Sequence, residues 1–300
     1  MAGLLEGKVT FITGAGRGQG RAHAVRQAGE GAKVIAVDIC EDIESTPYPM
    51  SSWDDLQHTR ELAEKAGGAC LAVKADVRQR DQLAEAVGRG VAEFGRLTTV
   101  CANAGILPLA MGDPQPLDYQ DAIDVDLIGV MNTVAVSVPH LLPAGREGSI
   151  IITGSTAALI PDTSAPGTPS WPIMGPGGAG YSFSKQTLVT YTKQMALHLA
   201  PSGVRVNIVH PTNCNTHLMH NQGIYHVFRP DRPDLADEVA KEDFRPASEA
   251  FHALPTAWIE PEEVAELVLF LASDGARNMT GTSTPIDAGC LIKRPNGPGQ

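Results

Sequence analysis

Short β-rich segments alternate with helical segments along the whole chain, and this alternation limits the possible fold more than any other feature. Seven segments are predicted to be strands, over residues 8–14, 33–38, 69–75, 97–103, 149–155, 204–209 and 283–287. Helices are predicted between them, over 21–30, 55–66, 78–94, 117–142, 180–200 and 261–273. Parallel strands joined by helices connect with a right-handed crossover. The pattern therefore predicts an α/β fold with a doubly wound, parallel, seven-stranded sheet in a three-layer αβα sandwich.

Length and composition favour one large domain over residues 1–300. The chain has 43% hydrophobic and 19% charged residues, which is ordinary for a globular protein. Three long segments interrupt the alternation, at 41–54, 161–179 and 213–257. Because long loops inside a compact domain are often lids or binding loops, we expect all three near a site and the third to bind substrate.

Charge and the chain start exclude several classes of protein. The formal net charge of −11 argues against a nucleic-acid partner, which would require clustered Lys and Arg. The first eight residues lack the pattern of a secretory signal, and no apolar run is expected to span a membrane. The five cysteines are scattered, which argues against disulfides or a zinc cluster. We expect a cytoplasmic protein with reduced thiols.

A glycine-rich turn lies between the first predicted strand and the first predicted helix. Its sequence, TGAGRGQG, matches T-G-x-x-x-G-x-G with Gly14, Gly18 and Gly20, and also contains Arg17 and Gln19. Glycines allow close approach of a pyrophosphate, and a helix N-terminus offers N–H donors to it. A flexible surface loop is the alternative, but the flanking strand and helix favour a dinucleotide cradle.

Asp38 and Ile39 stand at the end of the second predicted strand, about 20 residues past the glycine turn. A carboxylate there can accept hydrogen bonds from the adenosine ribose and repel a 2′-phosphate, which favours NAD over NADP. Arg17 is a contrary indication, because its guanidinium could bind that phosphate.

Three residues form a candidate catalytic group. Tyr181 and Lys185 are four residues apart and share one helix face, where a cation would lower the pKa of the phenol. Ser155 ends the fifth predicted strand, at the sheet edge where such folds bind ligands, and could donate to a substrate oxygen. Singly, each could be an ordinary surface or turn residue.

In these motifs the chain resembles the short-chain dehydrogenase/reductase family, which has a Rossmann fold. The resemblance implies NAD-dependent interconversion of a secondary alcohol and a ketone by Ser155, Tyr181 and Lys185, in a homotetramer. It also implies that Tyr181 and Lys185 contact the cofactor. The other positions that match cofactor-binding residues of the family are Asp76 and Val77 for adenine, Asn103, Ala104 and Gly105 for support, and Pro211, Cys214 and Thr216 for the carboxamide.

One position departs from the family pattern. Asp126 stands in the motif DLIG, where the family usually has an Asn that relays protons through water to the lysine. Asp126 is predicted to be a catalytic relay residue. Alternatively its charge acts directly on the Lys185 ammonium, or it caps or pairs locally.

The 41–54 insertion, the stretch before Tyr181 and the sequence HPTNCNT at 210–216 resemble the actinobacterial carveol dehydrogenase-like subgroup. This implies tightly held NAD that is reoxidised by an external carrier, mycofactocin. The 41–54 insertion follows Asp38 directly and contains aromatic and apolar side chains, so it is predicted to be a lid over the nucleotide or, alternatively, a solvent-exposed excursion. A ketone reductase with freely exchanging NAD(P)H and a non-catalytic dinucleotide-binding protein are the competing hypotheses.

Four histidines lie near Cys214 in the sequence, namely His210, His217, His220 and His226. Their spacing matches no standard metal site, and no metal site is predicted.

Overall fold

A computed structural model describes residues 3–109, 113, 115–160, 171–229, 231–232 and 237–293, and the side chains of these residues except 171–174 and 237–240. They form a seven-stranded sheet in the order β3-β2-β1-β4-β5-β6-β7, in which every neighbouring pair is parallel. The predicted fold is confirmed. The strands are β1 (Val9–Thr13), β2 (Lys33–Asp38), β3 (Cys70–Lys74), β4 (Thr99–Ala102), β5 (Ser149–Thr153), β6 (Arg205–Pro211) and β7 (Ser283–Ile286).

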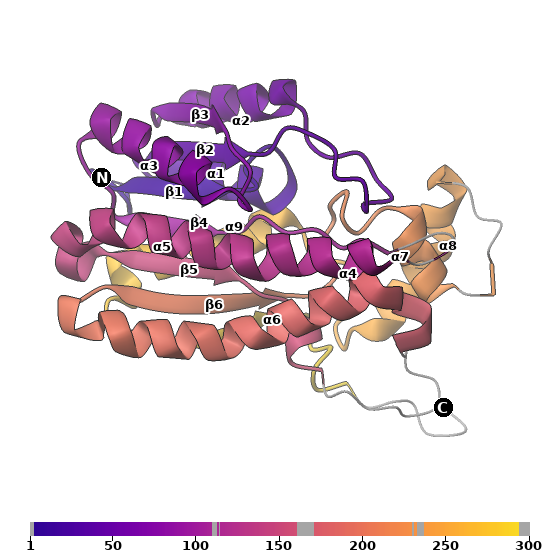
Figure 1. Ribbon diagram of the computed structural model, residues 1–300. Helices are drawn as coiled ribbons and strands as arrows, with labels where there is room; N and C mark the ends of the chain where they lie inside the picture. Colours follow the sequence, from indigo (N-terminus) through magenta and orange to yellow (C-terminus); the bar gives the residue numbers. More distant parts are fainter. Residues whose placement is uncertain are drawn as a thin grey trace.

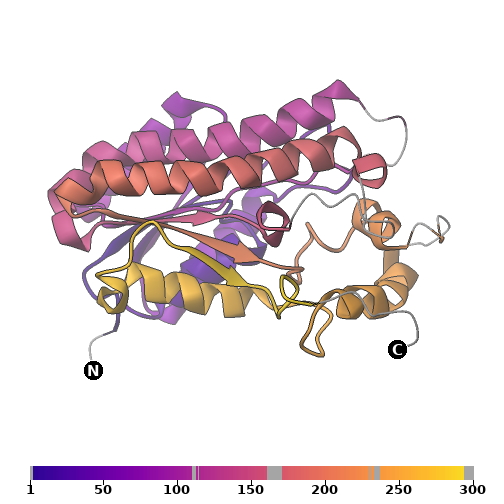
Figure 2. The same ribbon diagram turned by 90° about the horizontal axis from the view of Figure 1, so that it is seen from below.

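Helices cover both faces of the sheet, as the ribbon shows from two sides (Figures 1 and 2). One layer contains α1 (Gly18–Ala28), α2 (Trp53–Ala66) and α9 (Pro261–Ala272). The other contains α3 (Arg80–Phe94), α4 (Pro116–Ile123), α5 (Val130–Leu141) and α6 (Trp171–Leu199). Strands β1, β5 and β6 are buried along their whole length, as expected for a parallel sheet covered on both sides.

The helix predicted over 117–142 is interrupted in the structure. A π-helical turn, η1 (Asp124–Gly129), separates α4 from α5, so the prediction of one continuous helix is wrong. A π-helical turn accommodates an extra residue and is common at functional sites.

By length and composition alone Pro116–Glu147 could cross a membrane, contrary to the sequence expectation, although 56% of its most apolar window is buried inside the protein.

All three interrupting segments contain more helix than expected. Helix α2 begins at Trp53, so the 41–54 insertion ends two residues earlier, and α6 begins at Trp171. Residues 161–170 lie outside the described part of the chain. The 213–257 segment contains α7 (Gln222–Phe228) and α8 (Asp237–Phe251), which were missed because their apolar pattern is short and rich in His and Pro.

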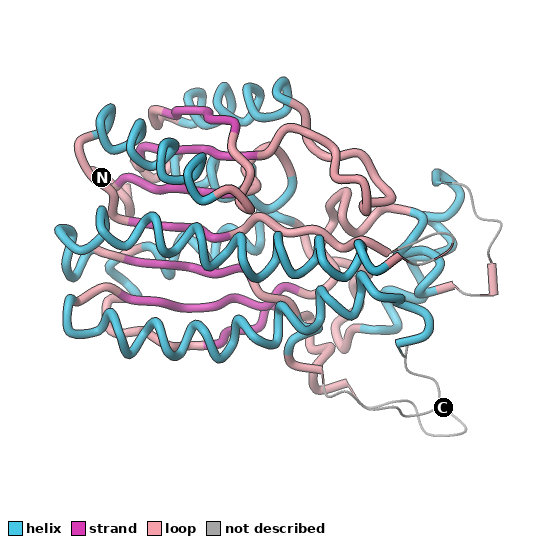
Figure 3. The backbone as a smooth tube through the Cα atoms, in the orientation of Figure 1, coloured by secondary structure: helices cyan, strands magenta, loops and turns pink. Residues whose placement is uncertain are grey.

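Helices α7 and α8 lie beyond the carboxyl ends of the strands, apart from the two main layers (Figure 3). They have a small core of their own, separate from the two clusters that cover the sheet. It consists of Leu107, Leu109, Met219, Ile224, Tyr225, Val227 and Phe244. This lobe faces the edge of the sheet where parallel α/β folds bind their ligands.

Candidate active site

A cavity of about 820 Å³ opens at the carboxyl edge of the sheet and extends from the glycine turn to α7. The structure places every sequence-predicted site residue on its wall. These residues are Gly14, Arg17, Gly18, Gln19, Gly20, Asp38, Ile39, Asp76, Val77, Asn103, Ala104, Gly105, Asp126, Ser155, Tyr181, Lys185, Pro211, Cys214 and Thr216.

The glycine turn is shaped to receive a pyrophosphate. Gly14 has a positive φ of +68°, and a Cβ on Gly20 would lie 2.0 Å from the Gly14 carbonyl oxygen, so neither position accepts a side chain. The N-cap of α1, Arg17, makes no side-chain capping bond, and its first turn holds no acidic residue. Within the described chain Gln19 Oε1 is buried without a partner. The uncapped N-terminus of α1, which carries the N–H groups of a first helical turn, and the close backbone approach fit a dinucleotide.

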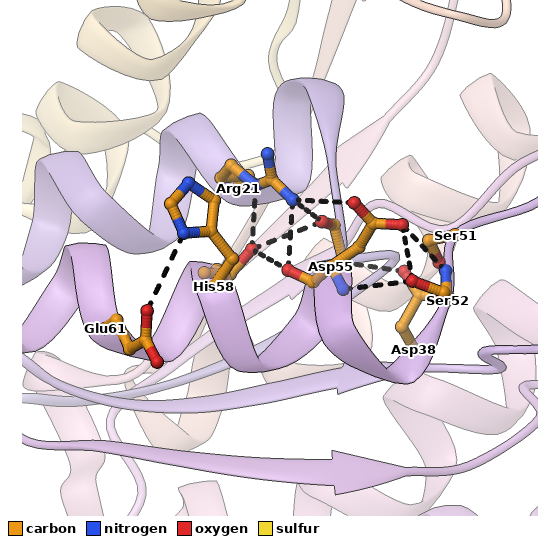
Figure 4. A network of polar contacts seen from close by, with 9 residues as sticks. Arg21, Asp38, Ser51, Ser52, Asp55, His58 and Glu61 are labelled. Carbon is orange, nitrogen blue, oxygen red and sulfur yellow. Dashed lines mark hydrogen bonds and ion pairs between the residues drawn. The ribbon is translucent and has the colours of Figure 1, made fainter.

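The carboxylate of Asp38 connects the glycine turn to the segment that follows β2. It accepts hydrogen bonds from the Gly16 N–H at 2.8 Å and from the Ser51 hydroxyl at 2.6 Å. Figure 4 shows Asp38 beside Ser51 and Ser52, where α2 begins. Because a 2′-phosphate would lie against this buried carboxylate, the geometry fits NAD better than NADP.

Asn103 holds the ends of three strands together beneath the cavity. Its amide donates to the Thr13 carbonyl oxygen at 3.1 Å, and its side-chain oxygen accepts from the Thr153 hydroxyl at 3.1 Å. Asp76 is fixed by Arg78, 2.7 Å away, and with Val77 forms the wall past β3. The supporting role predicted for Asn103 thus corresponds to bonds between β1, β4 and β5.

Ser155, Tyr181 and Lys185 converge at the centre of the cavity. Ser155 follows β5, and its hydroxyl hydrogen-bonds with the Tyr181 phenol. Lys185 lies one turn further along α6, with Nζ 5.4 Å from the centroid of the Tyr181 ring. Its ammonium donates to the Thr153 carbonyl oxygen at 3.1 Å and pairs with Asp126 at 3.0 Å. Such a group can orient an alcohol oxygen and take its proton.

The expected lowering of the Tyr181 pKa is not what the structure shows. Burial raises the pKa of the phenol, Lys185 and the hydrogen bond with Ser155 lower it, and the Asp126 carboxylate raises it further. The net direction is upward. The sequence argument counted the cation but not the burial of the phenol, which is the largest influence on its pKa.

His210 is a residue of the site that sequence reasoning misplaced. Its Nδ1 lies 2.9 Å from the Ser155 carbonyl oxygen, and its Nε2 lies 2.8 Å from the Ser283 hydroxyl. A Cβ on Gly154 would lie 2.6 Å from Nδ1, so the strand end fits closely against the ring. Burial lowers the pKa of His210, which keeps it neutral. Its position directly before Pro211 on a buried strand was the available signal.

His220, which was also considered as a metal ligand, makes its contacts outside the cavity wall. His220 Nε2 lies 2.8 Å from the side-chain oxygen of Asn215, and its ring packs edge-on against Trp258 at 5.0 Å. Among the residues that the structure describes, no three His, Cys, Asp or Glu side chains are grouped to hold a metal ion.

Residues 41–52, here called the cover segment, pack along one side of the cavity. The Tyr48 hydroxyl accepts a hydrogen bond from the Leu107 N–H at 3.0 Å, and the Arg17 guanidinium donates to the Pro49 carbonyl oxygen at 2.6 Å. Ile43 and Tyr48 are buried. The alternative of a solvent-exposed excursion is therefore wrong for these residues, and Trp53, which starts α2 and is 44% exposed, is not part of the cover.

The substrate end of the cavity is apolar. Past Tyr181 its wall is made by side chains from the α7–α8 lobe and from the loop after β4, namely Leu107, Leu109, Met219, Ile224, Val227, Phe228 and Phe251. Between this end and the cradle, the Thr216 hydroxyl donates to the Cys214 carbonyl oxygen at 3.3 Å. A neutral, largely hydrocarbon substrate fits such a wall.

Comparisons with known proteins agree over nearly the whole chain. A family model described as enoyl-(acyl carrier protein) reductase matches residues 14–290. A (-)-trans-carveol dehydrogenase of Rhodococcus erythropolis is 40% identical, over 96% of this chain and 99% of the relative. The structure of carveol dehydrogenase from Mycobacterium avium in complex with NAD has a TM-score of 0.85 at 39% identity, over 97% of this chain and 100% of that one. A short-chain dehydrogenase from Mycobacterium paratuberculosis bound to NAD has a TM-score of 0.81 at 37% identity, with the same coverage of both chains.

Proposed function

The chain belongs to the short-chain dehydrogenase/reductase family, and from this premise we propose that it oxidises a secondary alcohol to a ketone with NAD. The observation that carries the proposal is the convergence of Ser155, Tyr181 and Lys185 between a dinucleotide cradle and an apolar wall. The relatives support the cofactor, because two similar structures contain NAD. They support the substrate class, because one similar protein is a carveol dehydrogenase.

The residues divide the work in a way that follows from their positions. NAD, when bound in the cradle, supplies the hydride acceptor. The Ser155 hydroxyl orients the substrate oxygen, and the Tyr181 phenolate removes the hydroxyl proton. Lys185 stabilises the phenolate through its charge, and His210 holds the backbone of Ser155. The apolar side chains of the lobe exclude water from the reacting atoms.

We further propose that NAD stays bound between turnovers and that an external carrier, mycofactocin, reoxidises it. The contacts of the cover segment with Asp38, Arg17 and Leu107 support slow cofactor release, since all three must break for the segment to open. The carrier itself rests on the resemblance to the carveol dehydrogenase-like subgroup.

One experiment tests the cofactor and the chemistry together. Purified protein is denatured, and the released material is identified by absorbance and mass. Native protein is then mixed with carveol, and reduction of bound NAD is followed by absorbance in a single turnover. If NAD stays bound through purification and is reduced when the alcohol is added, the proposal is supported. Cofactor that is absent after gel filtration but restores turnover when added indicates a freely exchanging enzyme. No reduction by any secondary alcohol would rule out the dehydrogenase function.

We also propose a homotetramer. Large apolar side chains are exposed on α5 and α6, two helices of the same layer over the sheet. They include Met131, 38% exposed, Phe183, 49%, and Leu197, 79%. Burial between copies would remove this surface from water. Light scattering coupled to gel filtration measures the mass, and a monomer would contradict the proposal.

A further inference from the structure

A buried ion pair joins the π-helical turn η1 to α6 behind the Tyr181 phenol. Asp126 Oδ1 lies 3.0 Å from Lys185 Nζ, and the two side chains are 0% and 3% exposed. The other carboxylate oxygen, Oδ2, accepts from the Ile106 N–H at 3.3 Å. Each charge is therefore the buried partner of the other, and losing one would leave the other uncompensated.

The space around this pair is closed. A Cβ on Gly105 would lie 2.7 Å from Asp126 Oδ1 and 3.4 Å from Lys185 Nζ. The carboxylate and the ammonium therefore meet directly, on a glycine that leaves room for nothing larger than hydrogen. Lys185 donates one of its three N–H groups to the Thr153 carbonyl oxygen and forms an ion pair with Asp126.

We infer that Asp126 is a positioning residue for the alcohol oxidation proposed above. Its carboxylate fixes the Lys185 ammonium and offsets its charge, so that Tyr181 gives up its proton at a higher pH than it would beside Lys185 alone. The inference rests on the proposed function for the meaning of that proton. The charge balance itself is a property of this chain whatever alcohol it uses.

Asp126 and Lys185 are the charged groups of this balance, and burial raises the pKa of the Asp126 carboxyl against the opposing effects of Lys185 and the Ile106 N–H. Lys185 and Asp126 act on Tyr181 with opposite sign. Tyr48, on the cover segment, stays neutral because burial raises the pKa of its phenol. His210, on β6, stays neutral because burial lowers the pKa of its imidazole. Burial also lowers the pKa of Lys185, but Asp126 and Tyr181 outweigh it, and the net direction is upward, as for a stable ammonium.

The variant Asp126→Asn keeps the shape of the side chain and removes its charge. We expect the pH midpoint of single-turnover NAD reduction by carveol to move about one unit toward acid, because a charge this close shifts a pKa by roughly 1–3 units. Below the midpoint the variant should react about tenfold faster than wild type. The matched control is Asp124→Asn, which removes a carboxylate from the same π-helical turn and should leave the midpoint unchanged.

A second measurement separates this inference from the proposed function. Tyrosinate absorbance is titrated in wild type and Asp126→Asn, each against its own Tyr181→Phe reference, which needs no substrate. A lower phenol midpoint in Asp126→Asn supports the inference even if no alcohol reacts. An unchanged midpoint overturns it. A slower reaction at every pH with the midpoint unchanged also overturns it, and would make Asp126 a relay or a purely structural residue.

Discussion

Tyr181 is the residue on which the chemistry depends, and its surroundings explain why it must be tuned. The phenol lies next to the Lys185 ammonium and the Ser155 hydroxyl, and the Asp126 carboxylate pairs with that ammonium. Burial alone would keep it protonated. The pKa of the Tyr181 phenol therefore depends on several effects that partly cancel, and single substitutions can separate them.

Replacing Tyr181 by Phe removes the ionisable oxygen and keeps the ring. We expect NAD binding to stay close to wild type and turnover to fall about 10²- to 10⁴-fold, the usual contribution of a general base. Rates are measured by bound-NAD reduction, and retained cofactor by absorbance. Tyr191→Phe, on the same helix and away from the cavity, is the control. A loss smaller than about tenfold would contradict the assignment.

Asp38 determines the choice between the two nicotinamide cofactors. Asp38→Asn removes the charge, and its amide oxygen can still accept from the Gly16 N–H while its NH2 can donate to the Ser51 hydroxyl. The preference for NAD over NADP should fall at least about tenfold, equivalent to roughly 1.4 kcal/mol. Affinities of protein stripped of cofactor are measured by titration, with the exposed Glu44→Gln as control. An equal loss for both cofactors would mean that Asp38 supports the cradle without selecting.

The cover segment is the element with the clearest expected effect on cofactor exchange. Shortening Ile43 through Ser52 to a tight turn should convert retained NAD into exchanging NAD, with the fold unchanged. Tyr48→Phe should do so in part, because it removes only the bond to the Leu107 N–H. Exchange against labelled NAD and cofactor loss during gel filtration measure the effect. If the shortened protein retains NAD as long as wild type, the segment is not a lid.

Periodicity and turn chemistry predicted the strands because each strand is short, apolar and bounded by glycine or by a polar residue. The helix break at Asp124–Gly129 was not predictable, since a π-helical turn has the same composition as the α-helix around it. The pairing of Asp126 with Lys185 was one of three alternatives that sequence left open. The contact of His210 with Ser155 depends on strand register, which brings residues 55 positions apart together.

For the molecule as a whole, we expect the free energy of unfolding to fall at acid pH. His23, on α1, is fully buried, and burial lowers its pKa to about 4. Neither of its ring nitrogens has a hydrogen-bond partner among the described residues. The unfolded chain titrates near the usual value of about 6.5. The contribution of neutral His23 is thus complete above pH of about 6.5 and is lost as the pH falls toward about 4.

Urea unfolding at several pH values measures this effect. Over that window the wild-type free energy of unfolding should fall by about 3 kcal/mol through His23 alone. His23→Gln should flatten the slope, whatever its stability at neutral pH, and the exposed His58→Gln should not. Equal slopes for wild type and His23→Gln would show that another group governs the acid transition.

The α7–α8 lobe is closed at its base by its own residues. The Asn213 amide donates to the Ser248 hydroxyl at 2.8 Å, Ser248 donates to the Ala257 carbonyl oxygen, and the Ile259 N–H donates to the Asn213 carbonyl oxygen at 2.9 Å. The two ends of residues 213–257 thus lie side by side, and the core of the lobe adds only Leu107 and Leu109 from the loop after β4 to the side chains of this segment. Such a segment can be exchanged between relatives as a cassette. We expect an exchanged lobe to change the apolar wall that meets the alcohol, while Ser155, Tyr181 and Lys185 stay in place.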